Sequence, residues 1–201
     1  MKDRKYKFTD ETKEVYGTTL HRIVALKDFA GVENGDKGGW IENENNLSQY
    51  GNAWVYGNAR VFDNAEVYGD AMVYGNAQVY GNARVFDNAE VFGNAWVYGD
   101  AMVYGNAEVY GNARVFGRAE VFGIAMVYDN AGYIVFKNFW SSGRYFTWTR
   151  SNNMWRVGCF YGTGEELIAK AYKDSEKSGR EYERVVRYVE SILADEQTEN
   201  K

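Results

Sequence analysis

Few residues of this chain are suited to nucleophilic or metal chemistry. Its 201 residues include one histidine, His21, and one cysteine, Cys159. A typical zinc site needs several such ligands, and His21 could activate Cys159 only through a tertiary contact. His21 is therefore expected to be a structural strand residue and Cys159 a buried structural cysteine. No metal site, catalytic residue or cofactor is predicted.

Carboxylates in the middle of the chain are the next candidates for chemistry. Asp63, Asp70 and Asp87 stand at the predicted corners of a repeat, and glutamates such as Glu66 and Glu90 stand on its faces. A calcium site needs several oxygen atoms that converge on one point. These carboxylates occur singly along the chain, so we expect them to be solvated.

Aromatic side chains are the candidates for binding. They make up 17% of the chain. Large exposed aromatic side chains usually mark a contact surface. The aromatic residues near the C-terminus could instead line a pocket for a nucleotide or a sugar. The binding candidates are Trp54, Trp96, Trp140, Tyr145, Trp148, Trp155 and Arg156.

A six-residue repeat must position the aspartates, Trp54 and Trp96. Alanine returns at every sixth residue from Ala53 to Ala131, and valine does so from Val55 to Val127. In the unit Ala-x-Val-Tyr-Gly-Asn, a short strand points Ala and Val to one side and x to the other, and the polar pair forms a tight turn. Three units close one triangular coil of about 18 residues, and the coils stack as parallel strands at ~4.8 Å. The sequence predicts a mainly β fold, a single-stranded parallel β-helix.

A tyrosine or phenylalanine follows each inward valine. At the spacing of one coil these residues, from Tyr56 to Tyr128, are predicted to form three stacked ladders at the corners. The ladders have two interpretations, which are stiffening of the solenoid or a surface for a protein partner.

Non-repetitive segments flank the repeats, which gives three predicted domains: an N-terminal β cap at 1–50, the solenoid at 51–135 and a C-terminal α+β module of two strands and two helices at 136–201. In the cap, strands are expected at 5–9 and 18–26, then a glycine-rich turn at 35–39. In the module, strands are expected at 144–150 and 154–160. A capping box of Thr163 and Glu166 opens a helix to about 172, and a second helix covers 180–194.

The repeat unit resembles those of left-handed parallel β-helices, which implies a left-handed coil. More narrowly, the chain resembles phage- and prophage-encoded hexapeptide-repeat proteins. That resemblance is carried by Gly35–Glu42, Asn46–Gln49, the opening GNAWVYGNARV and Gly158–Leu167. It implies a viral protein in the bacterial host cytoplasm with no established activity.

Acyltransferases of the β-helix fold generally use a solenoid histidine, and carbonic anhydrases of this fold use three. Since the repeats contain none, the chain is predicted not to be an enzyme.

Charge and composition limit the possible classes of partner and the expected location. The formal net charge is -5, which argues against a nucleic-acid partner. The first five residues hold no apolar segment, and no long apolar run could cross a membrane, so we expect neither a signal peptide nor a membrane segment and a cytoplasmic location.

The predicted function is therefore a non-enzymatic, phage-derived binding protein that acts by protein–protein contact, with the solenoid as scaffold or oligomerisation rod. Interference with a bacterial defence system is one such role. The expected partner is a bacterial host protein or a second copy of the chain in a homo-oligomer. Two alternatives stay open: a small-ligand binder for a nucleotide or sugar through the C-terminal module, and a purely structural self-assembling protein.

Overall fold

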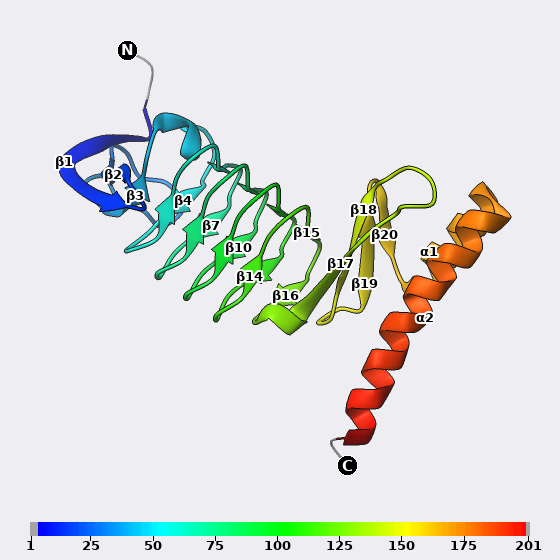
Figure 1. Cartoon of the computed structure of the whole chain (residues 1–201). Helices are drawn as coiled ribbons and strands as arrows, with labels where there is room; N and C mark the ends of the chain where they lie inside the picture. Colours follow the sequence, from blue (N-terminus) through cyan, green and yellow to red (C-terminus); the bar gives the residue numbers. More distant parts are fainter. Residues whose placement is uncertain (1–3, 200–201) are drawn as a thin grey trace. The chain divides into compact units, whose positions relative to one another are not determined.

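The structure, a computed structural model, describes residues 4–199 and consists mainly of short strands (Figure 1). In the repeat region each strand pairs in parallel with the strand one coil later, as Glu90 does with Glu108. Each coil adds one strand to each of three sheets, the largest of which continues into the N-terminal cap. The predicted parallel β-helix is confirmed.

The strands of residues 4–199 fall into four sheets. The first contains, in order, β1 (Tyr6–Val15), β2 (Thr18–Ala25), β3 (Lys37–Ile41), β5 (Arg60–Val61), β8 (Gln78–Val79), β11 (Trp96–Val97) and β14 (Arg114–Val115). The second contains β16 (Met126–Val127), β13 (Glu108–Val109), β10 (Glu90–Val91), β7 (Met72–Val73) and β4 (Trp54–Val55). The third contains β15 (Glu120–Val121), β12 (Met102–Val103), β9 (Arg84–Val85) and β6 (Glu66–Val67). The fourth is antiparallel where β19 meets β20 and contains β17 (Tyr133–Lys137), β18 (Tyr145–Thr149), β19 (Met154–Val157) and β20 (Phe160–Gly162).

The solenoid core consists of the repeated valines and alanines. Every one of these side chains from Ala53 to Val127 is buried. The backbone amides bond along the stack, as when the Trp96 amide donates to the Ala113 carbonyl at 2.9 Å. A narrow apolar interior and a continuous backbone ladder therefore hold the coils together.

The corners explain the aromatic and polar positions of the repeat. Phe62 and Tyr80 stack with ring centroids 5.0 Å apart, and Tyr74 and Phe92 stack at 4.7 Å, which confirms the predicted ladders. The following residue has positive φ, as at Gly81 (φ 71°), where a Cβ would approach the next coil's backbone to 3.0 Å. The corners thus combine ring stacking with a turn that favours glycine.

The N-terminal cap closes the first coil with a strand where the sequence predicted a turn. Gly38 and Gly39 belong to β3, which pairs in parallel with β5, so the predicted glycine-rich turn at 35–39 is wrong for these residues. A Cβ on Gly38 would lie 2.5 Å from Ile23, and one on Gly39 would lie 2.6 Å from Val55. The glycines are needed because β3 packs directly on its neighbours.

Buried polar groups fasten the cap to the first coil. The Lys5 ammonium donates to the Ala53 carbonyl at 2.8 Å, and burial is the main reason why the pKa of Lys5 falls to about 8. The Asn46 amide, in the 3₁₀ turn η1 (Glu44–Asn46), donates at 2.9 Å to both the Asp63 and the Ala65 carbonyls. These bonds satisfy carbonyl groups that an open solenoid end would leave unpaired.

The C-terminal part contains two strands more than predicted, β17 and β20, before helices α1 (Gly164–Asp174) and α2 (Glu176–Glu199). The predicted capping box is confirmed, because the Thr163 hydroxyl accepts from the Glu166 amide at 3.3 Å and the Glu166 carboxylate accepts from the Thr163 amide at 2.8 Å. A second 3₁₀ turn, η2 (Asn130–Gly132), follows the last coil.

Cys159 is exposed, so its predicted burial is wrong. Val157 pairs with Phe160, which leaves Gly158 and Cys159 as the turn between β19 and β20. Gly158 has φ 55°, and this turn directs Cys159 outward.

Two compact units make up the chain. One comprises the residues up to Ile134 together with Thr149–Asn152, and the other comprises Val135–Trp148 together with the chain from Asn153 onward.

Candidate functional site

Trp54 and Trp96 were the candidates for contact on the solenoid surface, and the structure places them differently. Trp54 is 1% exposed because the cap covers it, with the Phe29 ring at 5.3 Å and the Tyr6 ring at 6.1 Å. It therefore offers no surface to a partner. Trp96 stays half-buried on the outward side of β11.

Two of the C-terminal candidates belong to the core of their unit, and the other three lie partly at its surface. Trp148 and Trp155 are fully buried, and the Trp148 indole donates to the Asn153 side chain at 2.8 Å. Trp140 is half-buried, edge-on to Tyr182 at 5.2 Å. Tyr145 and Arg156 are partly exposed, with the Lys137 ammonium 5.7 Å from the Tyr145 ring.

The outward side of the first sheet brings together the side chains best suited to bind a ligand. Across β3, β5, β8, β11 and β14, five residues stand side by side in register, two of them tryptophans, two arginines and one a glutamine. In order they are Trp40, Arg60, Gln78, Trp96 and Arg114. We call this row the outward ladder. The Arg114 guanidinium lies 4.6 Å above the Trp96 ring, as in a cation–π pair.

At the cap end of the ladder, three cations surround Trp40. The Lys13 ammonium lies 4.6 Å and the Arg22 guanidinium 5.1 Å from its ring centroid, and Arg60 is its neighbour in register. Burial, then Arg60 and Arg22, lower the pKa of Lys13. We call Lys13, Arg22 and Arg60 the cationic cluster.

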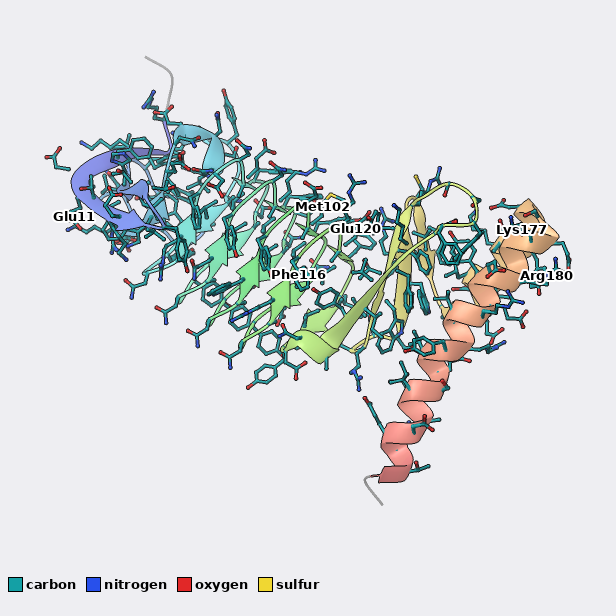
Figure 2. All side chains as sticks on the ribbon, viewed as in Figure 1. Glu11, Met102, Phe116, Glu120, Lys177 and Arg180 are labelled. Atoms are coloured by element: carbon teal, nitrogen blue, oxygen red, sulfur yellow. The ribbon has the colours of Figure 1, made fainter. Side chains whose placement is uncertain are left out.

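Within residues 4–199 no carboxylate forms an ion pair with the cationic cluster. Glu11, labelled in Figure 2, is bonded to Lys37, although Arg22 is near enough to help lower the pKa of Glu11. The Arg22 and Arg60 Nε atoms and the Trp40 Nε1 atom are buried without hydrogen-bond acceptors. One Arg22 Nη atom donates to the Gly57 carbonyl at 3.0 Å, and the cluster keeps positive charge that none of the described carboxylates pairs, which suits an anionic ligand.

Beside the cluster lies a pocket of about 560 Å³. Its lining consists of Tyr16, Thr18, Phe62, Asp63, Tyr80 and Trp96. Tyr16 (φ 53°) and Gly17 (φ 83°) form the turn between β1 and β2. Val15 and Leu20 at the same end of this hairpin pack against Trp40 and Phe62, which fixes the turn over the solenoid face.

The pocket has one acidic group among aromatic walls. Asp63 is exposed, and one of its carboxylate oxygens accepts from the Gly81 amide at 3.1 Å. Burial is the main cause that raises the pKa of Tyr80, and the nearby Tyr98, Tyr16 and Asp63 raise it further against the opposing effect of Arg114. Tyr80 is therefore a neutral hydroxyl at physiological pH.

The sequence indicated the solenoid half of this site but missed the other half. Arg60, Gln78, Trp96 and Arg114 lie 18 residues apart on one predicted face. Trp40 and the hairpin residues Lys13 and Tyr16 lie outside the repeat, so the period could not place them there.

The part of the chain that the structure describes contains no group of three or more histidine, cysteine or acidic side chains placed to hold a metal. None of its helices is both long and apolar enough to cross a membrane.

Comparison with known proteins supports the fold. Residues 65–81 and 77–93 match the model of the YdcK beta solenoid repeat. The chain is a repeat β-helix protein. It is also 38% identical over 60 residues to a protein of Escherichia coli strain K12 named "Uncharacterized acetyltransferase YdcK".

The match to this relative covers 26% of the present chain and only 18% of the relative. The relative's name nevertheless contradicts the prediction that the chain is not an enzyme, because that prediction rested on the absence of solenoid histidines. A missing imidazole excludes one mechanism of acyl transfer, whereas other groups can also accept a proton.

Proposed function

We propose that this chain is an acyltransferase that binds an acyl-coenzyme A donor on the outward ladder, with the donor's phosphates at the cationic cluster. The observation that carries this proposal is the cluster itself, where Lys13, Arg22 and Arg60 surround Trp40 and no carboxylate among residues 4–199 is paired with them. Phosphate oxygens satisfy such groups well, because arginine offers a fork of donors. The acetyltransferase name of the partial relative supports the class of reaction.

The pocket beside the cluster suits the reacting end of such a complex. Arg60 and Phe62 are two residues apart on the same stretch of chain, which spans about 7 Å, so the pocket and the cluster are neighbours. Asp63 is the carboxylate in the pocket lining and could accept the proton that an acceptor releases. The ring of His21 stacks on Phe8 at 5.1 Å and is not part of the lining.

The first test is binding of coenzyme A measured by calorimetry. Lys13→Gln and Arg22→Gln should each weaken binding about fivefold to tenfold, or ~1 kcal/mol, because each removes one partly exposed positive charge. Arg84→Gln is the matched control, since Arg84 is the outward arginine of β9 in the third sheet. The affinity should also fall as salt is added.

The second test is release of free thiol from acetyl-coenzyme A in the presence of an acceptor amine. The wild-type protein should release thiol faster than the Lys13→Gln variant at subsaturating donor. Coenzyme A binding that is absent, or equally weakened by Arg84→Gln, would contradict the proposed function.

A protein-contact role is the second candidate, favoured by apolar side chains exposed on the last coils. Phe116 is 50%, Ile124 68% and Tyr128 58% exposed, and Phe116 is labelled in Figure 2. If the chain self-associates through these residues, the molar mass measured by light scattering should rise with protein concentration. This rise should be lost in the double variant Phe116→Ser and Ile124→Ser. The phage origin, the host-protein partner and the interference with a defence system that the resemblance implies belong with this candidate. The comparisons lend them no support.

A further inference from the structure

We infer that the pocket of Tyr16, Phe62, Tyr80 and Trp96 binds a primary alkylammonium group, which would make an amine the acyl acceptor. The assignment of this group as the acceptor rests on the proposed function, whereas the binding itself does not. The inference starts from the composition of the lining, which combines four aromatic rings with one carboxylate.

The aromatic rings provide a surface that favours cations. The face of an aromatic ring carries partial negative charge, so several rings around one cavity attract an ammonium group while they also accommodate its alkyl chain. Phe62 and Tyr80 are parallel at 5.0 Å, and Trp96 meets Tyr80 edge-on at 6.4 Å. The walls are therefore not all coplanar. Trp96 already holds one cation of this kind, the Arg114 guanidinium.

Asp63 gives the pocket its charge preference. One of its oxygens accepts from the Gly81 amide, which leaves the other lone pairs of the carboxylate for a ligand. No lysine or arginine is among the lining residues, since Arg114 and the cationic cluster lie outside the pocket. An anion would meet the Asp63 charge there, whereas an ammonium would be attracted both by it and by the rings.

The two neighbouring sites thus differ in charge, and this difference would sort the two substrates. The donor's phosphates would be drawn to the cationic cluster and the acceptor's ammonium to the pocket. In the transfer, the ammonium first loses a proton to Asp63. Its nitrogen then attacks the thioester carbonyl, the C–N bond forms and the C–S bond breaks. The nitrogen then loses its second proton, which the departing thiolate takes up, and the proton on Asp63 passes to solvent, so charge and atoms balance.

The binding can be tested without any donor. In ¹⁵N-labelled full-length protein, the indole N–H signal of Trp96 is assigned by its loss in Trp96→Phe. Titration with butylammonium chloride should move this signal saturably, whereas butanol at the same concentration and sodium chloride at the same ionic strength should not. A titration with lysine whose α-amino and carboxyl groups are both blocked tests whether the ammonium can come from a protein side chain as well as from a free amine.

Two aspartates at equivalent corners provide a matched pair of variants. Asp63→Asn removes the charge but keeps an oxygen that can accept from Gly81, and Asp87→Asn makes the same change where Asp87 accepts from Gly105 at 3.2 Å. Asp63→Asn should weaken butylammonium binding at least threefold, and Asp87→Asn should not change it. Equal shifts with butanol, equal effects of the two variants, or no saturable shift would each overturn the inference.

The same preparation separates this inference from the proposed function. If butylammonium binds as described but coenzyme A does not bind, the pocket assignment stands and the acyltransferase proposal fails. If coenzyme A binds through the cationic cluster and butylammonium does not bind, the pocket assignment fails alone.

Discussion

At the residue scale, Lys5 shows how a charge can be buried where none of the described carboxylates is paired with it. Its ammonium lies among the carbonyls of Tyr50, Gly51 and Ala53, at 3.5, 3.5 and 2.8 Å, and 5.4 Å from the Phe29 ring. These acceptors keep the group bonded, yet burial still favours its neutral form and lowers its pKa to about 8. The closure of the solenoid end therefore depends on pH.

The direction of this pH dependence follows from the two states. Between about pH 8 and pH 10.5 the unfolded chain holds a proton on Lys5 that the folded chain has lost, so the free energy of unfolding rises with pH. The melting temperature of the wild type relative to Lys5→Met should therefore increase across this window. Lys7→Met, the same substitution at an exposed lysine of the same strand, is the control for the loss of a lysine. A constant difference for Lys5→Met would show that its pKa is not lowered.

Asp87 is a second residue whose role depends on backbone conformation. It stands where most coils have glycine, with φ 57°, and accepts from the Gly105 amide. Asp87→Gly loses the hydrogen bond but fits the left-handed backbone, whereas Asp87→Ala loses the bond and keeps a Cβ in the left-handed region, which costs about 1 kcal/mol relative to glycine. We expect Asp87→Ala to melt below Asp87→Gly, measured by circular dichroism. The reverse order would mean that alanine fits this corner without strain.

At the scale of the element, each two-residue strand has one face inside and one outside. In β13 the valine, Val109, is fully buried and Glu108 points outward. An aspartate at position 109 would be a charge in a dry interior, so Val109→Asp should cost about 4 kcal/mol or more. Glu108→Asp introduces the same side chain on the outer face and should unfold in urea like the wild type. A soluble, cooperatively folding Val109→Asp variant would contradict the assigned core.

The elements also show what the sequence could and could not predict. The six-residue period determines the inward valines, the corner ladders and the three sheets, because every coil repeats the same local interactions. β3 was missed since its glycines resemble a turn until the close packing against Ile23 and Val55 is known. The hand of the coil still rests on resemblance. The cationic cluster forms because a hairpin far away in the sequence packs on the solenoid, and no local sequence pattern predicts that contact.

At the scale of the whole molecule, the solenoid is nearly one-dimensional, so its stability should grow with the number of coils. Inserting a second copy of residues 101–118 after Arg118 adds one strand to each sheet and keeps every later residue on its face. At ~0.1 kcal/mol per residue, this coil should add about 2 kcal/mol to the free energy of unfolding. Urea unfolding should also show a larger m-value, because more surface is buried.

The same insertion tests whether the site depends only on the coils that form it. The pocket uses β5, β8 and β11 with the β1–β2 turn, all before residue 101, so the extra coil should leave butylammonium affinity unchanged. The contrasting variant has a second copy of residues 83–88 inserted before Ala89. These six residues keep the inward pattern of alanine and valine but shift every later residue by one face of the coil, so Trp96 moves from the first sheet to another, away from Tyr80. This variant should fold and lose binding, which would separate what the repeat contributes to stacking from what one face contributes to recognition. Retained binding in the six-residue insertion would place the ligand outside the outward ladder.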